Sequence, residues 1–113
     1  MLFRSLLAGT GIEPLFPLWG RDTSALAGEM VDAGLRARVS CVDLNVLPAS
    51  FAGRDYDQKF LADLPGAVDH CGENGEFHTF VYDGPMFRHP IALRAGRVSQ
   101  RGGFAYADLL PEA

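Results

Sequence analysis

The chain has almost no lysine, and this shortage limits the partners it suits. One lysine, Lys59, stands among ten basic residues in 113, and the others are arginines, which suit contacts with carboxylates and other anions. The net charge is −4, and no run of like charge occurs. Because nucleic-acid binding needs clustered basic side chains, this balance argues against nucleic acid as the main partner.

Cysteines and long apolar runs are also scarce. Two cysteines, Cys41 and Cys71, without a signal sequence indicate reduced thiols in a cytoplasmic protein. The N-terminal segment MLFRSLLAGTG is too short an apolar run for a membrane span, and no cleavage-type sequence follows it. We therefore expect a cytoplasmic protein that makes no membrane contact.

Phosphate-binding and nucleophile motifs are absent as well. The chain contains no GxxxxGK[ST], no GxGxxG after a strand, no SGG-type phosphate loop and no GxSxG elbow. By itself it has no recognisable apparatus for activating a nucleotide.

The first half of the chain predicts strand, helix and strand in one small α/β domain. The apolar segment Ile12–Trp19 holds two prolines and predicts an edge strand. A helix is expected over about 24–33, capped by Asp22 or Thr23, with an apolar face at helical spacing. Alternation over 35–44 predicts a half-buried strand with Cys41 on its core face.

The second half predicts a helix and then a run of strands. A helix over about 56–64, capped by Asp55, is expected to bury one face. That core face comprises Tyr56, Phe60, Leu61 and Leu64. Strands are expected over 77–82, 91–95 and 98–100, with a turn at Gly96-Arg97 between the second and the third. Residues 104–109 are expected to form either a last strand or an extended tail.

The stretch Asp69–Phe80, DHCGENGEFHTF, carries the densest chemistry and admits three interpretations. A zinc site would use His70, Cys71 and His78, but no CxxC or HxxH spacing supports it, so we rank it last. Asn74-Gly75 predicts a hairpin turn, although that turn does not explain the glutamates on either side of it.

The third interpretation is a ligand-binding loop. Its glycines let the backbone approach a ligand closely. Glu73 and Glu76 suit an ammonium group, another cation or Mg²⁺, or the role of a base, and His78 can exchange protons near neutral pH.

Three segments together resemble the C-terminal half of the diphthine–ammonia ligase family. They are PLWGRDTSALAGEMVDAGLRARVSCVD, FAGRDYD and LPGAVDHCGENGEFHTFVYDGPMF, of which CGENGEFHT is the most specific. The likeness runs from about Phe16 to about Pro90. These proteins are N-type ATP pyrophosphatases of the PP-loop superfamily, in which ATP adenylates a carboxylate and ammonia then displaces AMP.

The resemblance implies a divided chain. Residues 1–11 would be an artefact or a truncated start, residues 12–22 the last strand and exit turn of a nucleotide-binding domain, and residues 23–113 the C-terminal substrate-recognition domain, with a mixed sheet and two helices. ATP and Mg²⁺ would be bound by the missing N-terminal domain, and no cofactor is expected for this chain alone. The expected partners are a small-molecule or modified-residue substrate with ammonia, the PP-loop domain in cis or in trans, and a second copy in a homo-oligomer.

The resemblance also implies the roles of particular residues. Glu73, Glu76 and His78 would be catalytic. Substrate-binding residues would be Gly72, Asn74, Gly75 and Thr79 in the loop and strand, and Trp19, Gly20, Arg21 and Asp22 at the inter-domain turn. The alternative function is a stand-alone, non-catalytic small-ligand binding module that works with a separate nucleotide-binding chain.

Overall fold

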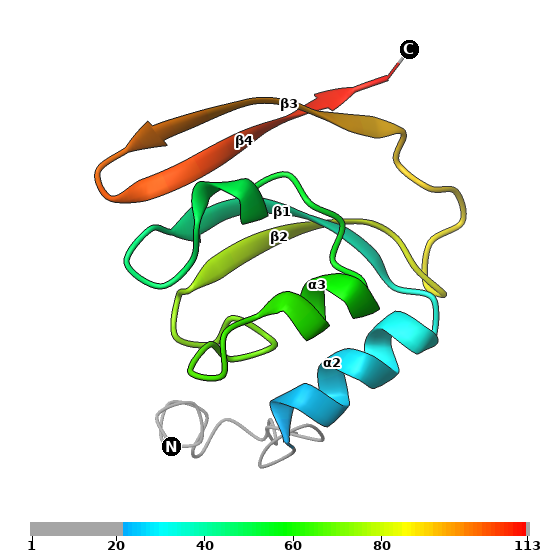
Figure 1. Ribbon diagram of the computed structural model, residues 1–113. Coiled ribbons are helices and arrows are strands. Elements are labelled where there is room, and N and C mark those ends of the chain that lie inside the picture. Colours follow the sequence, from blue (N-terminus) through cyan, green and yellow to red (C-terminus); the bar gives the residue numbers. More distant parts are fainter. Residues whose placement is uncertain (1–21, 113) are drawn as a thin grey trace, which may run out of the picture.

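The computed structural model describes residues 22–112, which form two helices, a short 3-10 turn and a four-stranded sheet (Figure 1). In chain order the elements are α2 (Thr23–Asp32), β1 (Arg36–Asp43), η1 (Ala49–Phe51), α3 (Gln58–Asp63), β2 (Phe77–Asp83), β3 (Leu93–Arg101) and β4 (Phe104–Pro111). The α/β class with two helices is confirmed. The expected strand over Ile12–Trp19 lies outside the described residues.

The sheet has the strand order β2-β1-β4-β3, and all three pairings are antiparallel, so among the described strands the sheet is not mixed. Both α-helices lie on the side of β1 and β2, while the β3–β4 hairpin forms the opposite edge (Figure 1). No helix of the described chain is long and apolar enough to cross a membrane.

Helix α2 follows the predicted pattern. Asp22 is its N-cap, and the Asp22 carboxylate accepts a hydrogen bond from the backbone N–H of Ala25. Ala27 and Val31, four residues apart, are buried on its inner face. The helix ends where Gly34 takes a φ of +106°, a conformation that glycine adopts without steric cost.

Helix α3 is shorter than predicted, and its cap is different. Asp57, not Asp55, accepts the hydrogen bond from the N–H of Phe60 and starts the helix. Asp55 instead forms an isolated bridge with Arg38 on β1 and a 3.6 Å ion pair with its side chain. The predicted core face of this segment is confirmed, since all four residues are buried: Tyr56, Phe60, Leu61 and Leu64.

An aromatic cluster around Phe60 fills the core between the helices and the sheet. The Phe60 ring lies 5.3 Å from the ring of Phe77, 5.5 Å from that of Tyr56 and 5.7 Å from that of Phe51, between centroids. These edge-to-face and tilted contacts are the arrangement that aromatic pairs prefer. They join α3, η1 and the first residue of β2.

A β-bulge in β1 changes which residues of that strand face the core, compared with the prediction. The register shifts between Val39 and Cys41, so Ser40 is an extra residue opposite β2. The alternation therefore changes phase: Val39 and Val42 are both fully buried, whereas Cys41 is only half-buried on the other face. The prediction that Cys41 shares the core face with Val39 was wrong for this reason.

The end of the chain forms one long hairpin. The segments expected as 91–95 and 98–100 join into the single strand β3, and Gly96-Arg97 is a bulge within it, where the register against β4 shifts. The turn lies at Gly102-Gly103, both with positive φ, between the paired residues Arg101 and Phe104. Two central residues with positive φ define the hairpin turn whose twist matches that of the strands.

Candidate functional site

The polar stretch before β2 folds as two successive turns, not as the tip of a hairpin. Gly72 N–H donates to the carbonyl of Asp69 at 3.0 Å, and Gly75 N–H donates to the carbonyl of Gly72 at 3.1 Å. Gly72 and Gly75 have φ values of +67° and +76°, but Asn74 does not have a positive φ, so the expected two-residue turn at Asn74-Gly75 does not form. We call residues 69–76 the double-turn loop.

The carboxylate of Glu76 anchors the double-turn loop through hydrogen bonds. Glu76 is buried, with 6% of its surface exposed. Its Oε2 accepts the backbone N–H of Asp69 at 2.6 Å, and its Oε1 accepts the N–H of Asn74 at 2.8 Å. Both oxygens are therefore engaged by the loop's own backbone, which fixes the separation of the two turns.

The carboxylate of Asp69, at the start of the loop, forms a second set of hydrogen bonds. Its Oδ2 accepts the N–H groups of Cys71 at 2.9 Å and Glu73 at 3.2 Å, and its Oδ1 accepts the hydroxyl of Thr23 at 2.6 Å. The double-turn loop is thus joined to the first residue of α2. The sequence carried a signal for this, because aspartate often binds the backbone N–H two residues ahead in a turn, but neither Asp69 nor Thr23 was predicted as a site residue.

These contacts lower the pKa values of the Asp69 and Glu76 carboxyl groups. Burial by itself would raise the pKa of Asp69, but the hydrogen bonds from Thr23, Glu73 and Cys71 outweigh it and hold the pKa below its usual value. Burial likewise acts to raise the pKa of Glu76, and the backbone N–H groups of Asp69, Glu76 and Asn74 bring it below the usual value. Both groups are therefore charged at neutral pH.

Tyr56 supports the loop from the core. Its hydroxyl donates a 2.6 Å hydrogen bond to the carbonyl of His70, and burial raises its pKa far above the usual value. The Sγ of Cys71 lies 3.6 Å from the carbonyl of Thr23 as a hydrogen-bond donor, and burial also raises the pKa of this thiol.

The structure does not gather His70, Cys71 and His78 into a metal site. Among residues 22–112, no three histidine, cysteine or carboxylate side chains lie close enough to hold a metal ion. His78 pairs with Cys41 in the sheet and is exposed on the face away from the core.

The predicted site residues fall into two groups. Asn74 and the loop lie beside the N-terminus of α2, where a 400 Å³ cavity opens. Its lining residues are Thr23, Ser24, Gly66, Ala67, Val68, Asp69, His70 and Asn74. His78 and Thr79, by contrast, lie on opposite faces of β2, because His78 pairs beside Cys41 and Thr79 beside the buried Val39.

Other predicted residues are accounted for separately. Glu73, Asn74 and Gly75 are exposed at the rim of the loop. The Asp22 carboxylate is occupied as the helix cap, where it also accepts the hydroxyl of Ser24 at 2.7 Å. Three predictions, for Trp19, Gly20 and Arg21, lie outside the described residues.

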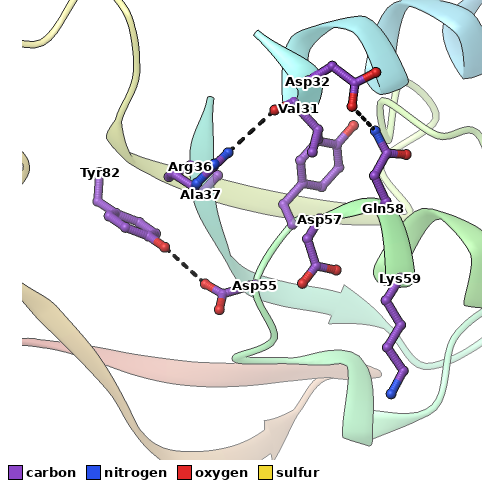
Figure 2. Close-up of a pocket in the computed structure, with 10 residues that line it drawn as sticks. Val31, Asp32, Arg36, Ala37, Asp55, Asp57, Gln58, Lys59 and Tyr82 are labelled. Carbon is purple, nitrogen blue, oxygen red and sulfur yellow. Dashed lines mark hydrogen bonds between the residues drawn. The ribbon is translucent and has the colours of Figure 1, made fainter. Parts of the chain in front are cut away.

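A larger hollow of 660 Å³ was not predicted (Figure 2). It lies between the end of α2, the start of β1 and the segment Asp55–Lys59. Figure 2 shows that its polar groups largely satisfy one another: Asp32 accepts from Gln58 at 2.9 Å, and Asp55 accepts from Tyr82 at 3.1 Å.

Fold and loop together define a small α/β domain, with a polar loop fixed by two carboxylates and no phosphate-binding loop among the described residues. The family model of the diphthamide synthase C-terminal domain matches residues 22–108, and the chain belongs to this family. Over 103 residues, 87% of the chain, it is 34% identical to diphthine–ammonia ligase of Danio rerio and 32% identical to those of Bos taurus and Homo sapiens. The chain spans about two fifths of the length of these relatives, at 40%, 39% and 39% respectively.

Proposed function

We propose that the chain is the substrate-binding part of an ATP-dependent, amide-forming ligase of the diphthine–ammonia ligase type. It would act with a PP-loop nucleotide-binding domain, in cis or in trans. The observation that carries the proposal is the double-turn loop, which lies inside the family match and is held rigid against the start of α2. A preorganised polar loop at the edge of a domain suits a substrate held against a second domain.

The proposed reaction has two balanced steps. A substrate carboxylate attacks the α-phosphorus of ATP, which forms an acyl-adenylate and releases pyrophosphate. Ammonia then attacks the acyl carbon, and the amide forms as AMP and a proton leave. ATP and Mg²⁺ would be held by the nucleotide-binding domain, because the described residues offer neither a phosphate loop nor a metal-ligand cluster.

Roles for individual residues follow from their contacts. Glu73 has an exposed side chain, and only its backbone N–H is bound within the loop, so we assign its carboxylate to a cationic group of the substrate or to the incoming ammonium. Glu76 would act by fixing the loop, since both of its oxygens accept backbone N–H groups. His78, which is exposed, would exchange protons with the substrate.

The remaining site residues would shape the pocket. Gly75 keeps the loop backbone open to the ligand, whereas Gly72 lets the loop pack closely against Phe77. Asn74 in the loop and Thr79 on β2 would contact the substrate from different elements. Trp19, Gly20, Arg21 and Asp22 would complete the site at the inter-domain turn. We also propose that the protein acts in the cytoplasm, where the free thiols of Cys41 and Cys71 would stay reduced.

A hybrid enzyme tests this function. The matched region of the zebrafish relative is replaced by this chain, and formation of AMP and pyrophosphate is measured with ammonia and a diphthine-bearing elongation factor. The expected result is turnover that depends on ammonia and is lost when the matched region is simply deleted. A hybrid that binds ATP but never forms AMP would contradict the ligase function, and substrate binding without turnover would favour a non-catalytic binding module.

A further inference from the structure

The acidic and basic side chains of the described residues are divided between two parts of the chain. Residues 22–83, which include both helices, β1 and β2, carry eleven carboxylates and four basic groups, a net charge of −7. Residues 84–112, which include the β3–β4 hairpin, carry four arginines and two carboxylates, Asp108 and Glu112, a net charge of +2. The hairpin lies at the edge of the sheet remote from the helices (Figure 1), so the molecule has an acidic body and a basic edge.

The arginines of the acidic body are already engaged. Arg38 pairs with Asp55 at 3.6 Å, and Arg54 pairs with Asp63 at 3.0 Å. Arg36 donates to the backbone carbonyls of Leu35 and Val31. Carboxylates of the acidic body therefore pair with Arg38 and Arg54, and neutral carbonyls engage the guanidinium of Arg36.

The arginines of the basic edge are different. Arg94 and Arg97 are exposed on β3, and neither forms an ion pair with a residue that the structure describes. Arg101, at the end of β3, lies over the ring of Tyr106 at 5.2 Å, a contact that leaves its hydrogen-bond donors available. Arg94, Arg97 and Arg101 lie three and four residues apart along β3, and the bulge at Gly96-Arg97 lies between the first two.

Strand β3 also offers a free backbone edge, since in the described sheet it pairs only with β4. Val98, between the arginines, is 43% exposed. An edge strand with free N–H and C=O groups, spaced guanidinium groups and an apolar side chain is suited to an added strand. We propose that β3 binds an extended acidic segment of a partner protein, which lies along this edge and places carboxylates against Arg94, Arg97 and Arg101.

Two other occupants are less favoured. A second copy that paired β3 with β3 would bring arginines opposite one another, and like charges across strands are destabilising. A nucleic acid is a long polyanion, and the body with its net charge of −7 repels it more than it repels a short acidic segment. Exposed arginines and a bulge also protect an edge from aggregation, and a purely protective role would give no binding.

Binding of a defined peptide to the whole 113-residue chain tests the proposal. The probe is an eight-residue peptide of alternating Glu and Thr, followed by amide shifts in ¹⁵N NMR spectra at 0.05 M and 0.5 M NaCl. We expect saturable shifts on β3 and about tenfold weaker binding at the higher salt. Arg97→Gln should weaken binding, whereas Lys59→Gln, which removes one positive charge from α3, should not.

Three results would overturn the proposal. The first is the absence of shifts on β3 at low salt, the second is a peptide response centred on the double-turn loop, and the third is tighter binding of an eight-nucleotide oligouridylate at the same salt. The triple variant Arg94→Gln/Arg97→Gln/Arg101→Gln should keep the wild-type dispersion of its spectrum and lose peptide binding. If that variant aggregates, the single Arg97→Gln variant still decides the outcome.

Discussion

Thr23 donates a 2.6 Å hydrogen bond to the carboxylate of Asp69, which lies 46 residues later in the chain. This bond ties the first turn of α2 to the loop that carries the candidate substrate residues. Because Asp69 also accepts the N–H groups of Cys71 and Glu73, a movement at the start of the helix displaces the backbone of the loop. The start of α2 and the double-turn loop are therefore connected through the hydrogen bonds of the Asp69 carboxylate.

Removing the Thr23 hydroxyl should loosen the loop. Thr23→Val keeps the shape of the side chain but deletes the donor, and we expect it to lower the free energy of unfolding by about 1–3 kcal/mol, because the acceptor is charged. Amide hydrogen exchange should accelerate at Cys71 and Glu73 but not at Phe60, whose N–H is held by Asp57. Thr23→Ser, which keeps the hydroxyl, should exchange like the wild type, and equal rates in all three proteins would contradict the coupling.

The two glutamates of the loop should respond differently to the same substitution. Glu76→Gln places an amide NH₂ against a backbone N–H in a buried position, and we expect a loss of about 1–3 kcal/mol in the free energy of unfolding by urea titration. Glu73→Gln changes an exposed side chain and should shift stability by less than about 0.5 kcal/mol. If both variants unfolded alike, Glu76 would not be the residue that holds the loop.

Acid should destabilise the folded chain through the two buried or bonded carboxylates of the loop, Asp69 and Glu76. The pKa values of Asp69 and Glu76 are lowered in the folded chain, so the stability they contribute is present above their ordinary values of about 4 and is lost as the pH falls through the folded values. The free energy of unfolding, measured by urea titration from pH 7 to pH 3, should therefore fall at the acid end. The double variant Asp69→Asn/Glu76→Gln should be less stable at pH 7 and show a shallower fall, and parallel curves would refute the assignment.

Elements with strong periodicity were predictable, and bulges were not. The apolar face of α2 and the buried face of the segment 56–64 follow from helical spacing alone. The bulges at Ser40 and at Gly96-Arg97 depend on how two strands pair, which local alternation does not encode. The turn at Gly102-Gly103 did carry a local signal, because a Gly-Gly pair between two strand-like runs is typical of a tight hairpin.

The sequence indicated which residues could form the candidate site, but not how their side chains are buried or oriented. The stretch 69–80 was expected to be a loop that leads into a core strand. The loop is present, but β2 is an edge strand of the described sheet and Phe77 is its one buried residue, so the core-strand part of the prediction was wrong. The composition also could not show that Glu76 is buried under the loop or that His78 and Thr79 face opposite ways. The buried Glu76 carboxylate accepts the backbone N–H groups of Asp69 and Asn74, and this arrangement depends on the double turn, which composition does not encode.

The two loop glycines provide a final test of that geometry, because both have positive φ but only one is crowded. A Cβ at Gly72 would lie 2.9 Å from the carbonyl oxygen of Phe77, whereas a Cβ at Gly75 would meet nothing within 4 Å. Gly75→Ala should therefore lower the free energy of unfolding only by the cost of placing alanine at a positive φ, roughly 1–2 kcal/mol. Gly72→Ala should cost clearly more, because the rigid backbone of β2 must move, and thermal unfolding of the two variants side by side measures the difference. Equal losses would mean that the loop does not pack against the start of β2 as described.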